Sequence, residues 1–414
     1  MIRSSKHSLK FANICKLSEL NLLIIEYKRL VNVIVNHVWE HGYRGLKIQQ
    51  NRLNCPSMMD CTFLENFPST YTERLKQAAA KQALSMISAA TEKRRKQLWQ
   101  LRKLQKLGEK PKYLQRKINL FPLIKPDTAN INLELDSRFV DFDFSDQSEF
   151  LCFIRLTSFK KGCSIKIPAP YSPVYTKWIQ LGTLKKSIRL NQKNVHLFFD
   201  AKETDKAETG SIIGCDQGIK DVVMLSDGQS AKLYQDRYSL SDVQHILARK
   251  KKGSKAFLRT QDFRKNVINW SINQLNFSGV KELRLERLFQ VGKGRGKSRY
   301  LSHWTYALIN DKLKRVSEEK GFLLREVPNE FRSQRCSECG WVRKANRKGK
   351  TFTCDKCSNA LDADLNAATN LMLDLYEIPF WVRLRKINRS GFYWKPEGIF
   401  SECQEPIVPD ATKE

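Results

Sequence analysis

Four cysteines in the last quarter of the chain have the spacing of a metal site. They form two CxxC pairs, Cys336 with Cys339 and Cys354 with Cys357, and fourteen residues separate the pairs. A CxxC turn lets two thiolates converge on one tetrahedral ion, and a second turn completes a closed site that adds folding energy. The spacing predicts a structural zinc ribbon with one Zn²⁺; unligated buried thiols or a redox pair are the alternatives.

The loop between the two pairs is strongly basic. It reads GWVRKANRKGKTFT, includes Arg343 and Arg347, and contains no acid. A basic loop without acids is typical of a surface that touches nucleic acid. We therefore expect the ribbon to contact a nucleic-acid backbone.

Three carboxylates far apart in the sequence could bind a divalent cation. Asp216 ends the apolar segment IIGCD, and Glu286 lies in the alternating segment VKELRLERL. The third is Asp362 or Asp364, just before a helix expected from about residue 365. Each has an ordinary explanation as a turn acid, an exposed strand residue or a helix cap, and Asp364 suits the last role well. If the fold gathers them, two Mg²⁺ ions bridged by carboxylates can activate water against a phosphodiester.

Two helices are expected before these segments. Apolar residues at helical spacing predict one helix over 17–40, with Ser18 as its candidate N-cap, and another over about 69–107. The later half of the second helix is basic and has few acids, so a phosphate backbone could satisfy it, although a solvated face explains most such runs. Its candidate nucleic-acid contacts are Lys93, Arg94, Arg95, Arg102 and Lys103.

The remaining segments predict two kinds of sheet. From about residue 130 to 202 apolar and polar residues alternate, which indicates a small antiparallel unit, a barrel or a sandwich. Beyond the linker DAKETDKAETG, apolar strands and helices alternate, including a basic helical region near 240–275. This order predicts α/β layers around a central sheet, so the fold class is α+β multidomain.

Length and charge narrow the possible partners. The 414 residues suffice for two or three domains, and 41% of them are apolar, which excludes wholesale disorder. Lys plus Arg outnumber Asp plus Glu by 73 to 43, a net charge of +30 that favours a polyanionic partner. No apolar run is long enough to span a membrane, the start lacks a signal-peptide core, and seven scattered cysteines do not suit a disulfide scaffold. We expect a cytoplasmic protein.

These features occur in an order that resembles a known family. The segments IIGCDQGIKDVV, ELRLERL, VPNEFRSQRCSECG, the second CxxC and DADLNAATNL resemble the RuvC-like half of the TnpB family. TnpB proteins are transposon-encoded RNA-guided nucleases, and the miniature type V CRISPR effectors, especially the f subtype, are their relatives. The resemblance covers about residues 210–376, whereas residues 1–205 share only the layout.

The resemblance implies an RNase H-like (RuvC) α/β nuclease domain with an inserted zinc ribbon, an antiparallel β wedge-type domain and a helical recognition domain. The implied boundaries are 1–16 for the first wedge strand, 17–128 for the recognition domain, 129–205 for a β-barrel wedge-type domain, 206–329 and 362–378 for the nuclease domain, 330–361 for the ribbon and 379–414 for a C-terminal tail.

The resemblance also implies roles for single residues. Asp216, Glu286 and Asp364 match the family's Mg²⁺-binding catalytic triad, and the four cysteines match its target-nucleic-acid-binding ribbon. Asp362 would then be a turn residue. Arg343 or Arg347 would help to hold the scissile phosphate.

The function implied is an RNA-guided, Mg²⁺-dependent DNA endonuclease. A structured guide RNA would occupy the basic helices and the β unit, and the target double-stranded DNA would be cut next to a short flanking motif. The protein would act as a monomer or as a homodimer on one RNA. The alternatives are a non-catalytic or weakly cleaving DNA-binding regulator and a transposon accessory protein of the kind named transposase.

The sequence departs from the family pattern in three places. Cys215 precedes the first acid where the family has Ile, and Ser358 follows the fourth cysteine where Gly is frequent. Residues 379–414 match no part of the family, and we expect a docking or disordered extension there.

Overall fold

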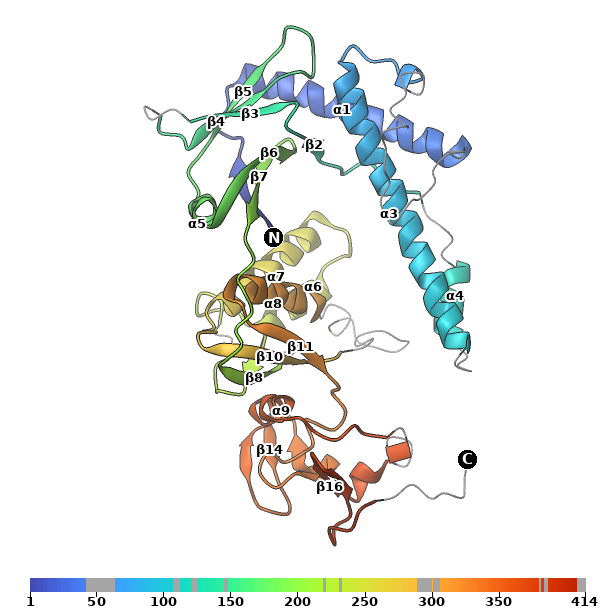
Figure 1. Ribbon diagram of the computed structural model, residues 1–414, viewed down its shortest axis with the longest axis vertical. Coiled ribbons are helices and arrows are strands. Elements are labelled where there is room, and N and C mark those ends of the chain that lie inside the picture. The colour runs from blue at the N-terminus through green and yellow to red at the C-terminus, as the bar shows by residue number, and fades with distance from the viewer. Residues whose placement is uncertain are drawn as a thin grey trace. The chain divides into compact units, whose positions relative to one another are not determined.

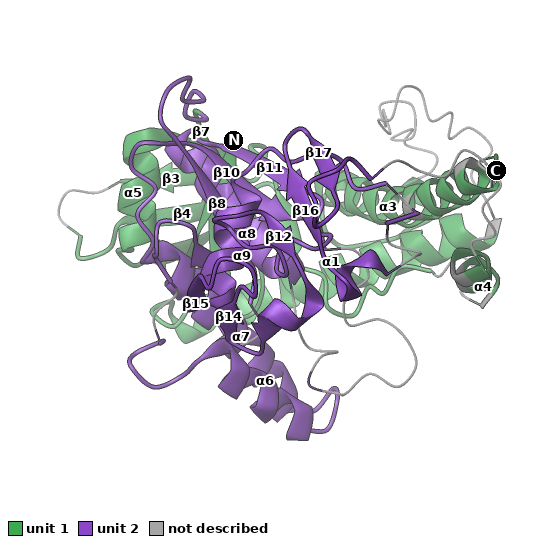
Figure 2. Cartoon of the chain, turned by 90° about the horizontal axis from the view of Figure 1, so that it is seen from below, with its two compact units in different colours: residues 1–202 green, residues 203–414 purple. Residues whose placement is uncertain are grey.

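The chain divides into two units, residues 1–202 and 203–414, which Figure 2 colours separately. Each unit has its own hydrophobic core. No helix in the described part of the chain is long and apolar enough to cross a bilayer. The computed structural model describes residues 1–41, 64–106, 112–120, 125–144, 148–218, 221–230, 233–288, 300, 306–379, 381–382 and 386–407.

The first part of the first unit is helical (Figure 1), with α1 (Ile14–His41), α3 (Glu73–Lys106) and α4 (Lys112–Leu120). The helices α1 and α3 pack through apolar faces, because side chains three and four residues apart lie on the same side of a helix. The buried residues on these faces include Tyr27, Leu30, Ile34, Leu75, Ala79 and Ala83.

The start of α1 corrects one expectation. The helix begins at Ile14, so Ser18 lies inside it and donates its hydroxyl to the Ile14 carbonyl at 3.0 Å. The side chain of Asn13 accepts instead from the Cys15 N–H at 2.9 Å. Asparagine is a strong N-cap residue, and a serine one turn into the helix cannot reach the free N–H groups at its start.

The first unit also contains two open antiparallel sheets. One has the order β1-β7-β6-β2 and the other β3-β4-β5, so the pairings among the described strands do not close a barrel. The first strand pairs along its whole length with the last strand of the unit, from Ile2 opposite Asp200 to Ser8 opposite Asn194. The elements are β1 (Ile2–Ser8), β2 (Leu133–Leu135), β3 (Val140–Asp143), β4 (Cys152–Leu156), β5 (Ile165–Ala169), α5 (Pro173–Leu181), β6 (Gly182–Leu190) and β7 (Asn194–Ala201).

A mixed sheet with the order β11-β10-β8-β9 forms the centre of the second unit (Figure 1). The strand β10 pairs in parallel with both β8 and β11, and helices make the crossovers that parallel pairing needs. Apolar side chains of this sheet and of the helices form one core, as the alternation of strands and helices predicts. The elements are β8 (Ser211–Asp216), β9 (Met224–Leu225), α6 (Leu240–Arg249), α7 (Lys255–Asn273), β10 (Val280–Glu286), α8 (Tyr306–Lys320) and β11 (Leu323–Val327).

The rest of the second unit consists of short strands around one helix, α9 (Ala363–Leu371). The strands β13 (Arg347–Lys348), β14 (Thr351–Thr353) and β15 (Ala360–Asp362) form one sheet, which leads directly into α9. The 3₁₀ turn η3 (Lys344–Asn346) precedes it.

The C-terminal segment is folded and docked onto the ribbon. The strand β12 (Trp341–Val342), next to the first cysteine pair, pairs with β16 (Phe392–Lys395), which pairs with β17 (Gly398–Phe400); the 3₁₀ turn η4 (Ile387–Arg389) comes before them. Phe392 and Trp394 are buried with Val342 in a small core of their own. Of the two expectations for this segment, docking is therefore confirmed over residues 386–407.

Candidate active site

The four cysteine sulfurs converge as their spacing predicts. Their Sγ atoms all lie within 4.8 Å of one another. The Sγ of Cys336 lies 3.6 Å from that of Cys357, and Cys339 and Cys354 are equally close. Four thiolates in one cluster are the donor set of a structural Zn²⁺ site, so the residues fit this ion.

Asp216 and Glu286 end two neighbouring parallel strands. Cys215 of β8 lies opposite Leu285 of β10, so the two acids follow at the same end of the sheet. Side chains alternate between the two faces of a strand, so both acids project from the face opposite to that of the buried Cys215 and Leu285. The carboxyl ends of parallel strands are where α/β sheets place their ligand sites.

The helix α9 brings Asp364 to the same region. Asp364 is in its first turn and is 6% exposed. Asp362 is the N-cap: its Oδ1 accepts from the N–H of Asp364 at 2.8 Å and from that of Leu365 at 3.1 Å. The suggestion that Asp364 caps the helix was therefore wrong, because Asp362 takes the free N–H groups and leaves the Asp364 carboxylate available.

A glycine lets α9 lie close to the sheet. Gly214 is two residues before Asp216 and faces the same side of β8. A Cβ atom there would lie 1.8 Å from the carbonyl oxygen of Ala368 in α9, closer than any real contact. Ala367 and Ala368 have small side chains and are both buried, so this part of the helix is thin. The helix therefore packs backbone to backbone on β8.

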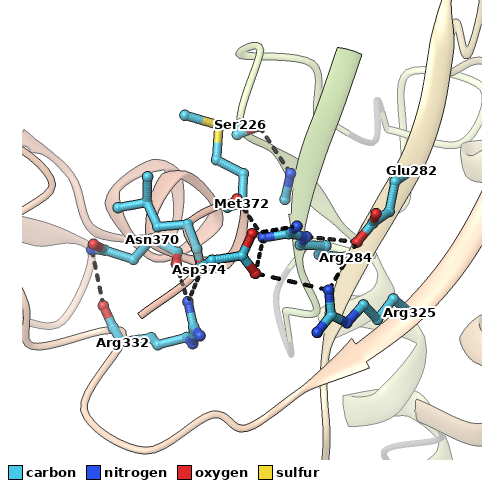
Figure 3. A network of polar contacts seen from close by, with 10 residues as sticks. Ser226, Glu282, Arg284, Arg325, Arg332, Asn370, Met372 and Asp374 are labelled. Carbon is cyan, nitrogen blue, oxygen red and sulfur yellow. Dashed lines mark hydrogen bonds and ion pairs between the residues drawn. The ribbon is translucent and has the colours of Figure 1, made fainter. Parts of the chain in front are cut away.

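A buried arginine fixes the other end of α9 (Figure 3). Arg284 of β10 is 2% exposed and lies two residues before Glu286 on the same face of the strand. Its guanidinium donates to the Met372 carbonyl at 2.8 Å, to Asp374 at 2.9 Å and to Glu282 at 2.7 Å. Cations stabilise the C-terminal carbonyls of a helix, so Arg284 ties the end of α9 to the strand that carries Glu286.

Two asparagines of α9 connect the helix to the ribbon. Asn370 donates to the carbonyl of Arg335 at 2.7 Å and accepts from its guanidinium at 2.6 Å. Asn366 donates to the same carbonyl at 2.8 Å and accepts from the Ser337 N–H at 3.0 Å. Arg332 donates to the backbone carbonyl of Asn370 (Figure 3). Both asparagines are fully buried, so the segments RSQRCSECG and DLNAATNL form one polar core.

The three carboxyl groups influence one another electrostatically. Burial, followed by repulsion from Asp364, raises the pKa of Asp216. Burial, followed by repulsion from Asp216, raises the pKa of Glu286. Within the described residues, however, the only His, Cys, Asp or Glu group of three or more that is already close enough to hold an ion is the cysteine cluster.

Two basic side chains of the ribbon pair with Asp364. Arg347 donates to Asp364 at 2.8 Å, and Lys350 contacts Asp364 and, at 2.6 Å, Asp221. Burial lowers the pKa of Lys350, but its bonds to Asp221 and Asp364 raise it overall. The other predicted ribbon arginine, Arg343, pairs with Asp355 instead.

The basic residues predicted in α3 belong to the first unit. Arg94 donates to the Ile118 carbonyl of α4 at 2.9 Å, and Arg95 pairs with Glu92 at 2.7 Å. Arg102 is exposed, and the side chains of Lys93 and Lys103 lie outside the described residues. Part of this run therefore has partners within its own helices.

The sequence predictions missed the residues that position the acids. The sequence placed Gly214 in a strand and Arg284 in an alternating segment but gave no sign of their contacts. Their partners in α9, and just after it, are more than 80 residues away. The clearest available signal was the small-residue and asparagine pattern of ADLNAATNL, which suits a helix packed closely on both sides.

Known proteins match mainly the segment that contains this site. Residues 306–371 match the family model described as Cas12f1-like, TNB domain. Over 77 residues the chain is 39% identical to the CRISPR-associated endodeoxyribonuclease Cas12f1 of Sulfoacidibacillus thermotolerans, a stretch of 18% of each chain. Over 83 residues it is 34% identical to a TnpB-like protein of Aquifex aeolicus, which is 19% of this chain and 27% of that protein. The matches thus span less than a third of these relatives.

A solved structure of a Cas12f1–sgRNA–target DNA complex aligns with 85% of this chain and 81% of that chain. The identity is 17% and the TM-score is 0.46, which is too low to establish a shared overall fold. The sequence matches carry the relationship: the segment that holds the cysteine pairs and the acidic motif is similar to the TNB domain of Cas12f1-like proteins and to part of a TnpB-like protein.

Proposed function

We propose that this protein is an RNA-guided, Mg²⁺-dependent DNA endonuclease with an RNase H-like (RuvC) nuclease domain in its second unit. One observation carries the proposal: Asp216 and Glu286 end neighbouring parallel strands, and both interact electrostatically with Asp364 of α9. The relatives named endodeoxyribonucleases support the reaction class.

The carboxylates suit Mg²⁺ as ligands. Mg²⁺ prefers carboxylate oxygens, and two buried acids with raised pKa values are those that a divalent cation would stabilise in the ionised form. Asp216 and Asp364 would hold the metal, and Glu286 would complete the site. When bound, the metal ions would supply an activated water and stabilise the leaving oxygen of the phosphodiester.

Other residues would prepare the site for a nucleic-acid strand. Arg347 and Lys350 contact Asp364, and their positive charges would move to a phosphate once the acid binds metal. The four cysteines with one Zn²⁺ would keep the hairpin that carries these two residues next to α9. Gly214 and Arg284 would hold α9 on the sheet.

The first unit would bind a structured guide RNA through its basic helix and sheets. The guide would pair with one strand of the target double-stranded DNA, while the protein reads a short flanking motif. One copy, or a homodimer on one RNA, would form the complex.

Cleavage by acid variants tests the proposal. The protein is purified with the RNA that it binds in cells, and DNA matching that RNA is incubated with Mg²⁺ or EDTA. We expect Mg²⁺-dependent cutting that Asp216→Ala abolishes while guide-dependent DNA binding remains. Undiminished cutting by this variant, or the absence of a discrete bound RNA, would contradict the proposal. A non-catalytic regulator would instead bind DNA and cut nothing with or without Mg²⁺.

A further inference from the structure

The corner between α6 and α7 carries positive side chains, whereas the cations that pair with Asp364 are Arg347 and Lys350 of the ribbon. Residues 249–259 contain six cationic side chains and no acid. Five of them are exposed, and none of these five forms an ion pair with any residue that the structure describes. The five are Arg249, Lys251, Lys252, Lys255 and Arg259.

The corner is a defined turn. Ser239 and Asp242 form a capping box at the start of α6, and Ser254 caps α7 by accepting from the Phe257 N–H at 3.1 Å. Gly253 supplies the left-handed conformation of the turn, with φ of +83°. Leu247 and Phe257 are buried on the inner side. The cations are therefore presented by a backbone that caps and apolar contacts hold in place.

The charges at this corner are unfavourable for the helix itself. Lys255 is the first residue of α7, whose first turn has no acid to balance the positive end of the helix. Lys255 and Arg259 are four residues apart, and like charges at this spacing destabilise a helix. Farther along the same helix, Lys265 pairs with Asp262 at 3.0 Å. A bound polyanion would relieve the repulsion at the start of α7.

We propose that the α6–α7 corner binds the phosphate backbone of a nucleic-acid duplex without reading its sequence. Single-strand sites combine cations with exposed aromatic rings, but the aromatic side chain within residues 249–259, Phe257, is only 4% exposed. Cations without base-reading groups position a duplex through its phosphates. The proposal rests on the proposed function for the nature of the duplex, because a guided nuclease would supply either an RNA–DNA or a DNA duplex.

Salt-dependent binding tests this site. The full chain is titrated with a DNA duplex of arbitrary sequence in EDTA without guide RNA, at several salt concentrations. Each phosphate contact contributes about 0.9 to the slope of log affinity against log salt. The variant Lys251→Gln, Lys252→Gln, Lys255→Gln should therefore lower the slope by up to about 3 and weaken binding at low salt at least about tenfold, with an unchanged Tm.

The control removes ion-paired lysines elsewhere in the second unit. Lys206 and Lys265 pair with Glu203 and Asp262, and their double change to Gln should leave the slope nearly unchanged, whereas the charge-matched corner change Lys251→Gln, Lys252→Gln should lower it by up to about 2. Equal losses in both variants would show a net-charge effect and overturn the proposal, as would an unchanged slope in the corner variant. So would a corner variant that loses binding to anionic lipid vesicles but not to the duplex. The guided-nuclease proposal can fail independently, because this binding needs neither guide nor cleavage.

Discussion

The four cysteines and the three carboxylates are brought together in different ways. All four thiol ligands come from residues 336–357, and their sulfurs already lie within 4.8 Å of one another. The acids come from β8, β10 and α9, and successive acids lie 70 and 78 positions apart in the sequence. Local turns therefore form one site, whereas tertiary packing forms the other.

The thiols and the carboxylates also differ in charge before a metal binds. Neutral thiols can approach before metal binds, whereas buried carboxylates repel one another until a cation stabilises them. In the second unit Arg347 and Lys350 partly fill this role at Asp364. The carboxylate site should thus depend on its supporting residues more than the cysteine site does.

Breaking the local site should have the largest effect. Cys354→Ser removes one of the four proposed zinc ligands, and because structural zinc supplies folding energy, we expect loss of bound zinc and unfolding of the ribbon. Zinc content and thermal unfolding measure this. The exposed Cys163→Ser, outside the cluster, is the control and should keep zinc. Full zinc occupancy in the Cys354 variant would contradict the assigned ligand set.

Gly214→Ala tests whether α9 must touch β8. The new Cβ would meet the Ala368 carbonyl, so the helix must move, at a cost of about 1–3 kcal/mol in the free energy of unfolding. Chemical denaturation measures the stability, and Mn²⁺ affinity should fall because Asp364 moves with the helix. Ser211→Ala at the exposed start of the same strand should change neither. Unaltered Mn²⁺ affinity in the Gly214 variant would show that metal binding does not depend on the position of α9, and would contradict this prediction.

Arg284→Met sharpens the comparison at the other end of α9. The variant leaves the Met372 carbonyl and Glu282 without their main partner, and we expect a loss of about 2 kcal/mol and weaker Mn²⁺ binding. The control is Arg325→Met, because Arg325 pairs with Glu282 and Asp374 from a half-exposed position. This variant should lower the free energy of unfolding less. Equal costs for the two variants would show that burial of Arg284 is unimportant.

The last prediction concerns pH, because the buried acids bind protons more tightly in the folded protein than in the unfolded chain. Burial and neighbouring acids raise the pKa of Asp216 to about 7 and that of Glu286 to about 8 in the folded protein. The folded state therefore binds more protons than the unfolded state, and stability in EDTA should fall as pH rises from about 4 to 8. Thermal unfolding of the double variant Asp216→Asn, Glu286→Gln should show a smaller fall. A wild-type stability that rises over this range would contradict the burial of these acids.

Much of the site could be predicted from the sequence where ligands are local or end recognisable strands. The CxxC pairs predicted a cluster that the structure confirms, and the apolar strand ending in Asp216 is a buried strand of the central sheet. The sequence left both Asp362 and Asp364 as possible N-caps and favoured Asp364, because two acids so close together compete for the same N–H groups and only the backbone geometry decides between them.

The remaining features depend on contacts that no local pattern encodes. The close approach at Gly214 can be predicted only if α9 is known to lie on β8. The docking of Phe392 and Trp394 can be predicted only if β16 is known to pair with β12. The alternation over 130–202 predicted antiparallel strands but could not decide how they divide into sheets, because strand order depends on long-range pairing such as that of β1 with β7.

Metal binding by the full chain tests the central claim most directly. Calorimetric titration with Mn²⁺ compares the wild type with Asp216→Asn and with Asp362→Asn, which keeps the helix cap and lies outside the proposed triad. We predict that the wild type binds Mn²⁺, that Asp216→Asn weakens the affinity at least about tenfold, a loss of about 1.4 kcal/mol, and that Asp362→Asn binds like the wild type. Equal affinity of the Asp216 variant and the wild type would contradict the assignment of these carboxylates as one metal site.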